Sequence, residues 1–319
     1  MKPPYDITNR ILSLVSSISE KIGEVKSARL IKPPTELRKR NRIKTIQSSL
    51  EIEGNTLTIE QITDLINRKR VLAPQKDILE VKNAIKVYSE LNKLKVYEID
   101  SLCKAHSILM KGLIDHPGQL RRTSVGIVKG EDLAHMAPPG DFVFPLIKDL
   151  FDYLKYDDDL LIIKCCVFHY EFEFIHPFLD GNGRMGRLWQ TLILKEYSPV
   201  FEFLPIESLI KERQQDYYHV LGKSDQQGSS TSFIEFMLDI INTALEDLLN
   251  TQNLTLTGVD RINLFRDIGG SDLFTRQDYL RHNKDISSAT ASRDLKEAVD
   301  KGLIDKAGDK RLTKYKFKN

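Results

Sequence analysis

The chain of 319 residues carries 47 Lys and Arg against 45 Asp and Glu, so its formal net charge is only +2. This balance excludes the strong overall field of a general nucleic-acid or membrane-surface binder, and three cysteines exclude a disulfide framework. Since the sequence has no secretion signal and no apolar run of membrane-spanning length, we expect a cytoplasmic protein of two or three compact units that does not bind a membrane.

The first part of the chain, residues 1–83, has the periodicity of helices and a break at Pro33–Pro34. One of these helices includes the hexapeptide Ser49-Leu-Glu-Ile-Glu53-Gly54, in which the glycine is typical of the residue that follows a helix C-terminus. By composition alone this is an ordinary charged helix end. We expect an N-terminal helical region over 1–83 and a helical core over 84–249.

Between Gln119 and Pro145 the pattern changes from helical to extended. A turn at Lys129–Asp132 and a rigid exit at Pro138–Gly140 bound a short strand that is predicted from Val125, Gly126, Ile127 and Val128. We therefore expect one β-hairpin in an otherwise helical core. The Arg121–Arg122 pair just before it either assists a phosphate or faces water.

The most informative segment runs His176-Pro-Phe-Leu-Asp-Gly-Asn-Gly-Arg-Met-Gly-Arg187. An apolar run over Leu160–Ile175, which includes two cysteines expected to be buried and reduced, leads to it. Because Pro177 disfavours helical geometry at the residue before it, this helix should end near Phe174 and place His176 in a loop. The Gly-Asn-Gly turn predicts the N-terminus of a new helix, where free N–H groups and the helix dipole attract anions.

The polar residues of this segment suit phosphate chemistry. His176 can accept a proton, and Asp180, the only carboxylate, suits Mg²⁺ shared with substrate oxygens and water. Gly181 and Gly183 let the backbone approach a phosphate, while two arginines three positions apart can clamp further phosphates. The segment therefore predicts a site that holds a polyphosphate and moves a proton.

Other interpretations of the same residues are weaker. Gly181–Gly186 also matches G-x-G-x-x-G, but the preceding strand and the βαβ unit that this dinucleotide-binding pattern requires are missing. His169 could form a metal pair with His176, yet Pro177 breaks the helical phase between them, so we interpret it as a packed core residue. We expect Phe178 to anchor the loop in the core.

The segment resembles the signature of the Fic family, His-x-Phe-x-(Asp/Glu)-Gly-Asn-Gly-Arg-x-x-Arg. All eight specified positions match: His176, Phe178, Asp180, Gly181, Asn182, Gly183, Arg184 and Arg187. The related Doc proteins, which phosphorylate their target, have a lysine at the position of Gly183, so the match favours the nucleotidylating branch. The resemblance implies transfer of AMP from ATP to a Ser, Thr or Tyr hydroxyl of a target protein. It implies His176 as general base, Asp180 as Mg²⁺ ligand, and the turn and arginines as phosphate ligands.

The resemblance also gives a meaning to Ser49–Gly54, which matches the (Ser/Thr)-x-x-x-Glu-(Gly/Asn) inhibitory motif of many Fic proteins. It implies that Glu53 pairs with Arg187, occupying the guanidinium needed by the γ-phosphate. The enzyme would then be autoinhibited. In some relatives the same glutamate supports removal of AMP, so a de-AMPylating hydrolase stays open as an alternative.

Two further regions acquire roles from the resemblance. The hairpin corresponds to a flap that aligns the target by strand addition, although an ordinary hairpin covering the core is the alternative. Tyr217 and Tyr218 correspond to tyrosines that contact the adenine, although neighbouring tyrosines on a helix are often packing residues. Beyond them we expect a polar loop over Lys223–Ser232 and an amphipathic helix over Phe233–Leu249.

A linker over residues 250–258 is expected to precede a small domain over 259–319. A short helix begins at Thr275–Tyr279, Ser287 offers an N-cap for a second helix, and Lys314–Phe317 alternates like a strand. This order resembles a winged helix-turn-helix domain. The expected fold class is thus mainly α: a helical Fic core with one hairpin flap and a small C-terminal winged-helix domain.

The tail has nine Lys or Arg and five Asp or Glu from residue 287 onward, which suggests DNA as a possible partner. DNA binding would direct four side chains of the second helix into a groove and two residues of the wing onto phosphates: Ser288, Thr290, Arg293 and Lys296, with Lys310 and Arg311. Asp294, Glu297 and Asp300 weaken this interpretation, and a protein-contact domain for homodimerisation or target choice is the alternative. A DNA-binding transcriptional regulator with a nucleotide sensor therefore remains the rival of the Mg²⁺-dependent enzyme.

Overall fold

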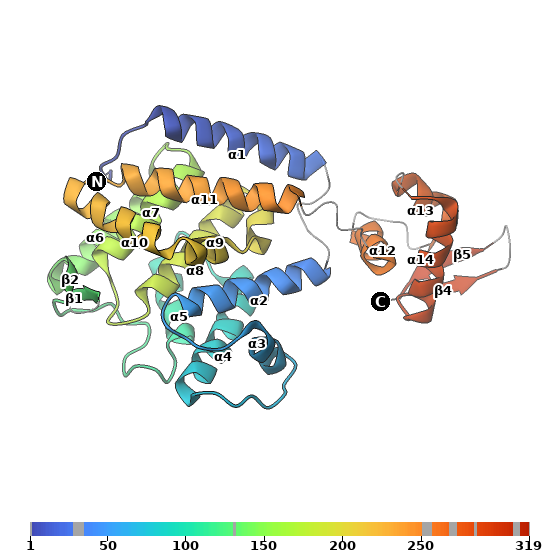
Figure 1. The fold of residues 1–319 in the computed structure, drawn as a ribbon, viewed down its shortest axis with the longest axis horizontal. Helices are drawn as coiled ribbons and strands as arrows, with labels where there is room; N and C mark the ends of the chain where they lie inside the picture. The colour runs from blue at the N-terminus through green and yellow to red at the C-terminus, as the bar shows by residue number, and fades with distance from the viewer. Residues whose placement is uncertain are drawn as a thin grey trace. The chain divides into compact units, whose positions relative to one another are not determined.

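The computed structural model describes residues 2–27, 35–129, 132–250, 257–267, 273–283, 286–308 and 313–318. The chain divides into two compact units: Met1–Lys32 with Arg40–Leu249, and Pro33–Lys39 with Asn250–Asn319. Figure 1 shows helices through most of the ribbon, which confirms the mainly helical class. The Pro33–Pro34 break, most of the expected linker, and Lys310 and Arg311 lie outside the described residues.

The chain up to residue 250 folds mainly into α-helices, with two short 3-10 turns at Leu91–Lys93 and Pro199–Phe203. The helices are α1 (Asn9–Ser27), α2 (Thr35–Glu51), α3 (Ile59–Ile66), α4 (Gln75–Ser89), α5 (Ile99–Leu109), α6 (Gly140–Tyr156), α7 (Leu161–Ile175), α8 (Asn182–Tyr197), α9 (Ile206–Glu212), α10 (Gln214–Gln227) and α11 (Thr231–Asn250). Among the described residues, no helix combines the length and the apolar character needed to span a bilayer.

Helix α7 forms the centre of the first unit. It is apolar around its whole circumference, as expected for a helix that is surrounded by others, and it packs against α6 and α8. Cys165 and Cys166 on this helix are buried and free, and His169 is fully buried. These observations confirm the interpretation of both cysteines as reduced core residues and of the histidine as a packed one.

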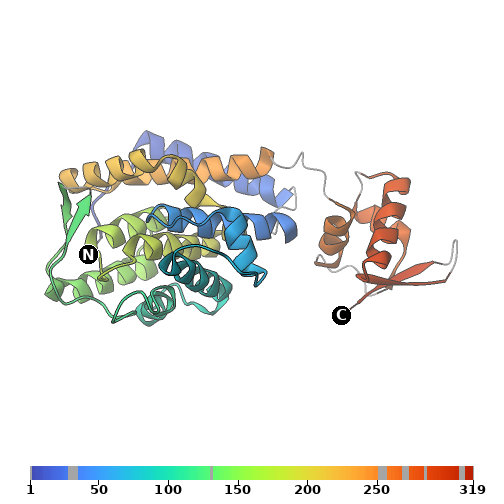
Figure 2. The ribbon, with the colours of Figure 1, turned by 60° about the horizontal axis from the view of Figure 1, so that its bottom comes forward.

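The N-terminal helices pack on the same core. Helix α1 lies along α11 in both ribbon views (Figures 1 and 2), and Ser17 donates a hydrogen bond of 2.9 Å to Asn242 between them. Helix α4 runs continuously across residue 83, the expected boundary of the N-terminal region, and packs against α5. The side chains of this helix therefore contribute to the same interior as those of α7.

The prediction of a loop over Lys223–Ser232 is wrong for residues 223–227. Helix α10 continues to Gln227, and Gly228 ends it in the left-handed conformation with φ of 60°. Such a glycine is a common helix terminator, because it adopts this conformation without steric cost. The polar residues from 223 to 227 therefore belong to a helix on which Ser224 is buried, and only three residues separate it from α11.

The expected hairpin is present in the first unit. Strand β1 (Gly126–Lys129) pairs antiparallel with β2 (Asp132–Met136), and the register shifts between Ile127 and Val128. Val125 lies just before the first strand. The middle of the expected turn, at residues 130 and 131, lies outside the part of the chain that the structure describes.

The C-terminal unit combines helices with a three-stranded antiparallel sheet of order β3-β5-β4. Its elements are α12 (Gly258–Asp267), β3 (Leu273–Phe274), α13 (Arg276–His282), α14 (Ser288–Asp300), β4 (Ile304–Ala307) and β5 (Lys314–Phe317). Ser287 caps α14 by accepting a 3.1 Å hydrogen bond from the amide of Thr290, as expected, and Thr275 caps α13. The sequence did not indicate α12 or β3. Both contribute buried side chains to a separate apolar core.

Candidate functional site

His176 stands at the point where the central helix ends. Helix α7 stops at Ile175, one residue later than expected, and His176 adopts the left-handed conformation with φ of 51° and ψ of 61°. Its amide still donates to the carbonyl of Phe172 at 3.0 Å. Because Pro177 cannot continue the helix, His176 begins the loop, and it is half-buried.

The loop between His176 and α8 is held by the side chain of Asn182. Its Oδ1 accepts from the amide of Phe178 and its Nδ2 donates to the carbonyl of the same residue, both at 2.8 Å. Phe178 is fully buried, which confirms it as the anchor of the loop. The structure thus places the Asn182 side chain on the loop backbone, while its own amide belongs to the first turn of α8.

His106 on α5 also holds this loop in place. Its ring stacks on Phe178 with centroids 3.7 Å apart. Its Nδ1 accepts from the amide of Gly118 at 2.7 Å, so the proton is on Nε2, which donates to the carbonyl of Asp180 at 2.9 Å. Burial lowers the pKa of His106 to about 4, and the ring is therefore neutral near pH 7. Nothing in the sequence distinguished this histidine from others.

The N-terminus of α8 presents the anion-binding geometry expected from the sequence. Gly181 occupies the N-cap with φ of 83°, and a Cβ there would lie 2.7 Å from the sulfur of Met110. The first amides of the helix have no partner within it, and the helix dipole adds positive potential at this end. A helix end of this kind can bind an anion through backbone donors.

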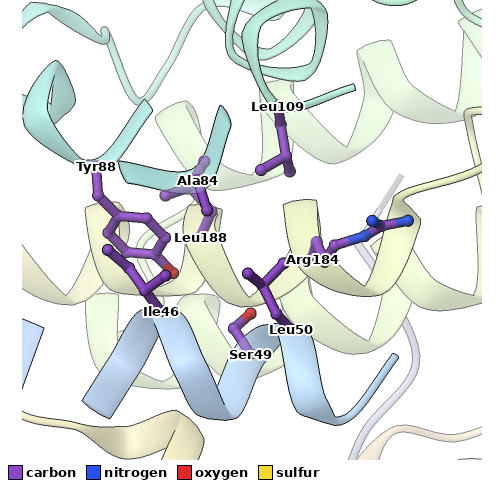
Figure 3. Close-up of a pocket in the computed structure, with 8 residues that line it drawn as sticks. All are labelled: Ile46, Ser49, Leu50, Ala84, Tyr88, Leu109, Arg184 and Leu188. Carbon is purple, nitrogen blue, oxygen red and sulfur yellow. The ribbon is translucent and has the colours of Figure 1, made fainter. Parts of the chain in front are cut away.

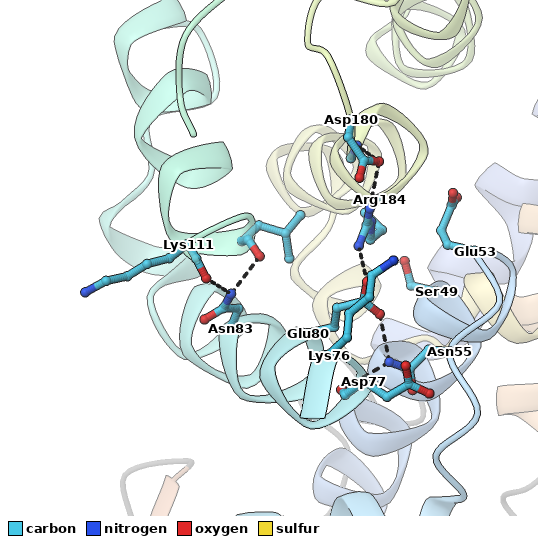
Figure 4. A network of polar contacts seen from close by, with 12 residues as sticks. Ser49, Glu53, Asn55, Lys76, Asp77, Glu80, Asn83, Lys111, Asp180 and Arg184 are labelled. Carbon is cyan, nitrogen blue, oxygen red and sulfur yellow. Dashed lines mark hydrogen bonds and ion pairs between the residues drawn. The ribbon is translucent and has the colours of Figure 1, made fainter. Parts of the chain in front are cut away.

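Arg184 is held between two carboxylates, as Figure 4 shows. Its Nη1 lies 3.2 Å from Oε1 of Glu80 on α4, and its Nη2 lies 3.0 Å from Oδ1 of Asp180. Glu80 also accepts from the side chain of Asn55 at 2.8 Å. Glu80 could not be recognised from the sequence, since a lone glutamate on a polar helix face is ordinary. Its contacts fix the guanidinium beside the loop.

Asp180 is the exposed acidic group of the site, with 53 % of its side chain accessible. Its contacts to Arg184 and to the amide of Gly181 both involve Oδ1. Among the described residues, no cluster of three or more His, Cys, Asp or Glu could hold a metal alone. A single accessible carboxylate next to a helix N-terminus fits Mg²⁺ that would also bind substrate oxygens and water.

Arg187 is buried one helical turn further and makes the pairing expected from the sequence. Its Nη2 lies 2.7 Å from Oε1 of Glu53 and 2.8 Å from the carbonyl of Ser49, while its Nε donates to Oγ of Ser49 at 3.1 Å. Burial lowers the pKa of Arg187, but the charge and hydrogen bond of Glu53, together with the charges of Tyr217 and Glu173, outweigh it, and the pKa is raised. Glu53 and Ser49 therefore accept the hydrogen bonds of both Nε and Nη2 of this guanidinium.

Glu53 does not lie on α2 itself. The helix ends at Glu51, and Glu53 follows in a turn that Gly54 completes with φ of 89°. From this turn its Oε1 reaches the first turn of α8, where it would be 2.4 Å from a Cβ on residue 183. The absence of a side chain at Gly183 thus makes room for the carboxylate at the anion-binding end of the helix.

The interface between α2 and the catalytic helices leaves little space. Figure 3 shows a small cavity of about 10 Å³ that is lined by Ile46, Ser49, Leu50, Ala84, Tyr88, Leu109, Arg184 and Leu188. This volume suits about one water molecule and excludes a nucleotide base. Helix α2 therefore packs closely on the side of α8 that carries the arginines.

The two tyrosines expected at the adenine have different environments. Tyr217 is 2 % exposed, and its hydroxyl lies 3.1 Å from Nε2 of His169 in the core. Tyr218 is half-buried and accepts a hydrogen bond of 3.3 Å from Gln214. Of the two tyrosines, only Tyr218 thus has an appreciably accessible side chain.

Arg121, one of the pair before the hairpin, neither faces water nor reaches the phosphate site. Its side chain is buried and donates hydrogen bonds to main-chain carbonyls, among them those of Thr123 and His176, whereas Arg122 is exposed. The earlier interpretations of Arg121 are therefore wrong. A buried arginine without a carboxylate partner carries no sequence signal, because its acceptors are backbone atoms.

The chain is similar to proteins of known family in both sequence and fold. The model of the Fic/DOC family matches residues 96–194, which include the loop and α8. The crystal structure of a Fic family protein from Desulfovibrio desulfuricans G20 is 40 % identical, covers 100 % of this chain and 99 % of that chain, and superposes with a TM-score of 0.76. The chain belongs to the Fic/DOC family.

More distant Fic proteins share part of the chain. Protein adenylyltransferase Fic of Drosophila willistoni is 29 % identical over 216 residues, which are 63 % of this chain and 40 % of that protein. Protein adenylyltransferase fic-1 of Caenorhabditis elegans is 26 % identical over 238 residues, or 66 % and 44 %. A solved structure of Caenorhabditis elegans Fic-1 is 19 % identical with a TM-score of 0.61, over 77 % of this chain, and shares the fold. This Fic chain thus spans about two fifths of the curated relatives that it matches.

Proposed function

We propose that this Fic protein is an adenylyltransferase that moves AMP from ATP to a Ser, Thr or Tyr hydroxyl of a target protein. The observation that carries the proposal is the position of His176, directly before a helix N-terminus that bears Asp180, Arg184 and Arg187. A base beside an anion-binding helix end has the parts that nucleotidyl transfer requires.

His176 would act as the general base. A hydroxyl is a poor nucleophile until its proton is removed as the new bond forms, and an imidazole is suited to accept it. In-line attack on the α-phosphate would form the O–P bond to the hydroxyl and expel pyrophosphate. His176 ends α7 in the left-handed conformation, which places it in the loop that leads to α8.

The phosphates would be held by the turn and the arginines. The amides of Asn182 and Gly183 suit the negative oxygens, whereas the amide of Gly181 donates to Asp180, and Arg184 is already fixed by Glu80. Mg²⁺ would be held by Asp180 together with phosphate oxygens, and it would neutralise charge that develops on them. For the adenine, the half-buried Tyr218 is the better candidate of the two tyrosines.

Autoinhibition by Glu53 is part of the proposal. Its carboxylate lies over Gly183 and pairs with Arg187, so a γ-phosphate could use neither without displacing it. ATP would then bind with its α-phosphate badly placed for attack. Since the same carboxylate could orient a water molecule, hydrolytic removal of AMP from a modified target remains the alternative reaction of this site.

The test is the exchange Glu53→Gly, incubated with labelled ATP and a cell lysate, followed by mass spectrometry of the labelled proteins. We expect labelled proteins with the variant and few with the native chain. Glu51→Gly is the matched control, because Glu51 lies two residues away and pairs with Lys211 instead. His176→Ala in the Glu53→Gly background should abolish labelling. Equal labelling by all four proteins would contradict the proposal.

A second candidate function has support in the C-terminal unit. Asp294, expected to weaken DNA binding by α14, is buried and paired with Arg261 and Tyr279, so it does not face solvent. The exposed residues of the helix include Ser288, Arg293 and Lys296. A DNA-binding, winged-helix role would make the Fic site a nucleotide sensor. Salt-sensitive binding of duplex DNA without any turnover, even in Glu53→Gly, would favour it.

A further inference from the structure

Arg121 connects the catalytic loop with the hairpin. Its guanidinium is 3 % exposed and makes four hydrogen bonds to main-chain carbonyls. Two of the acceptors lie at the end of α7: Nε donates to His176 at 2.6 Å and Nη2 to Ile175 at 2.9 Å. The other two stand before and after the hairpin: Nη1 donates to Thr123 at 2.6 Å and Nη2 to Pro138 at 2.8 Å.

The main chain of Arg121 strengthens the same connection. Its amide donates to the carbonyl of Pro177 at 2.9 Å, so the carbonyls of the three consecutive residues 175–177 all accept from one arginine. The carbonyls at the C-terminus of α7 have no partners within the helix and carry the negative end of its dipole. A cation is therefore stabilised at this position without a carboxylate, although burial lowers the pKa of Arg121.

Only an arginine can make this set of contacts. Its planar fork presents five N–H donors in fixed directions, whereas a lysine has three donors on one nitrogen at the end of a flexible stem. The hydrogen bonds here come from Nε, Nη1 and Nη2, three nitrogens that donate in different directions around the guanidinium plane. A lysine would keep the charge and lose part of the contacts.

We propose that Arg121 is a positioning residue that holds His176 in register with the β1–β2 hairpin, so that the base meets a hydroxyl presented by a target on that hairpin. This inference rests on the proposed adenylyl transfer for its functional consequence. Its structural part, the coupling of loop and hairpin, does not. Because none of the bonds reaches the anion-binding turn, nucleotide affinity should not depend on Arg121.

The test compares Arg121→Met and Arg121→Lys with Arg122→Met, all made in the Glu53→Gly chain. Amide hydrogen exchange should rise about tenfold or more in Arg121→Met, both at 175–178 and in the described hairpin residues, because several charge-assisted bonds are lost together. Helix α11 should not change. Arg121→Lys should be intermediate, and Arg122→Met, which alters the exposed neighbour, should match the parent.

Activity separates positioning from mere structural support. In Arg121→Met the kcat for labelling protein should fall at least tenfold, while the Kd for ATP stays within about twofold, as expected when only alignment is lost. Faster exchange over the whole unit, in both Arg121 variants, would reduce Arg121 to a folding role. Faster exchange confined to the loop and hairpin with unchanged kcat would also overturn the proposal. If the Glu53→Gly parent labels nothing, the proposed function fails, while the exchange data still decide the coupling.

Discussion

The Oε1 atom of Glu53 lies 2.7 Å from Nη2 of Arg187, although the two residues are 134 positions apart in the sequence. This contact brings a carboxylate to the helix end where a phosphate would bind. It also explains the glycine at position 183, since the same oxygen would be 2.4 Å from a Cβ there. The pair therefore links the N-terminal turn to the catalytic helix at one defined point.

Gly183→Ala is expected to displace Glu53 and to imitate its removal. The cost to the free energy of unfolding should be about 1.5–3 kcal/mol, the range of a hydrogen bond to a charged group, and should come from the lost pair. In a Glu53→Gly chain the same alanine should cost much less. A double-mutant cycle in urea measures this coupling. If the alanine lowers the free energy of unfolding equally in both backgrounds, its effect does not come from displacing Glu53.

His176→Ala should lower kcat for AMP transfer by a factor of about 10² to 10⁴ without lowering stability, because it removes a proton acceptor that is only half-buried. Pyrophosphate release by the Glu53→Gly parent and by the double variant measures the effect, and circular dichroism checks the fold. His219→Ala, which alters an exposed histidine, is the control. Activity retained in the His176 variant would exclude this histidine as the base.

Asp180→Ala should abolish the contribution of Mg²⁺ to nucleotide binding. In Glu53→Gly, we expect ATP to raise the melting temperature more in the presence of Mg²⁺ than with a chelator, since a ligand that binds only the folded state stabilises it. In the Asp180 variant the two shifts should be alike. Because the side chain is 53 % exposed, the unliganded variant should melt close to its parent. A full Mg²⁺ effect without Asp180 would assign the metal to another group.

Glu207→Gln should stabilise the protein at alkaline pH. Burial raises the pKa of Glu207 to about 7, above its ordinary value of 4.5. A carboxyl with a raised folded-state pKa contributes stability below pH 4.5 that is lost as the pH rises toward 7, because the unfolded chain ionises first. At pH 8 the neutral glutamine should be more stable than glutamate by up to roughly 3 kcal/mol, and the difference should vanish below about pH 4.5. Urea unfolding at both pH values measures it, and a difference that does not depend on pH would contradict the assignment.

Asp294→Ala should destabilise the C-terminal unit by about 3–5 kcal/mol, the cost of breaking a buried ion pair from one side. Asp294 is 4 % exposed, accepts from Nε and Nη2 of Arg261 at 2.7 and 2.8 Å, and also accepts from Tyr279. Thermal unfolding of the full chain should show an earlier transition for this unit only. Asp300→Ala, at an exposed position of the same helix, should change little. Similar melting of both variants would mean that the pair contributes no stability.

The local structure of the segment 176–187 could be predicted well, because its glycines, proline and charged residues have strong local preferences. The helix end at Pro177, the turn before α8 and the hairpin follow from such preferences. The contacts of Glu80, His106 and Arg121 could not be predicted, since they depend on packing between elements far apart in the chain. Asp294 was misread for the same reason, because its partner Arg261 lies on α12, a helix that the sequence did not indicate.

Under the proposed autoinhibition, the turn that carries Glu53 would determine how the site is released. Removing the carboxylate from Arg187 requires rotation of side-chain torsions, which in accessible residues takes picoseconds to nanoseconds, and not the unwinding of α2. The two bonds from Ser49 can hold Arg187 in place meanwhile. Basal turnover would then be set by the fraction of time the carboxylate spends swung out, a rapid equilibrium that any ligand able to compete for the guanidinium can shift.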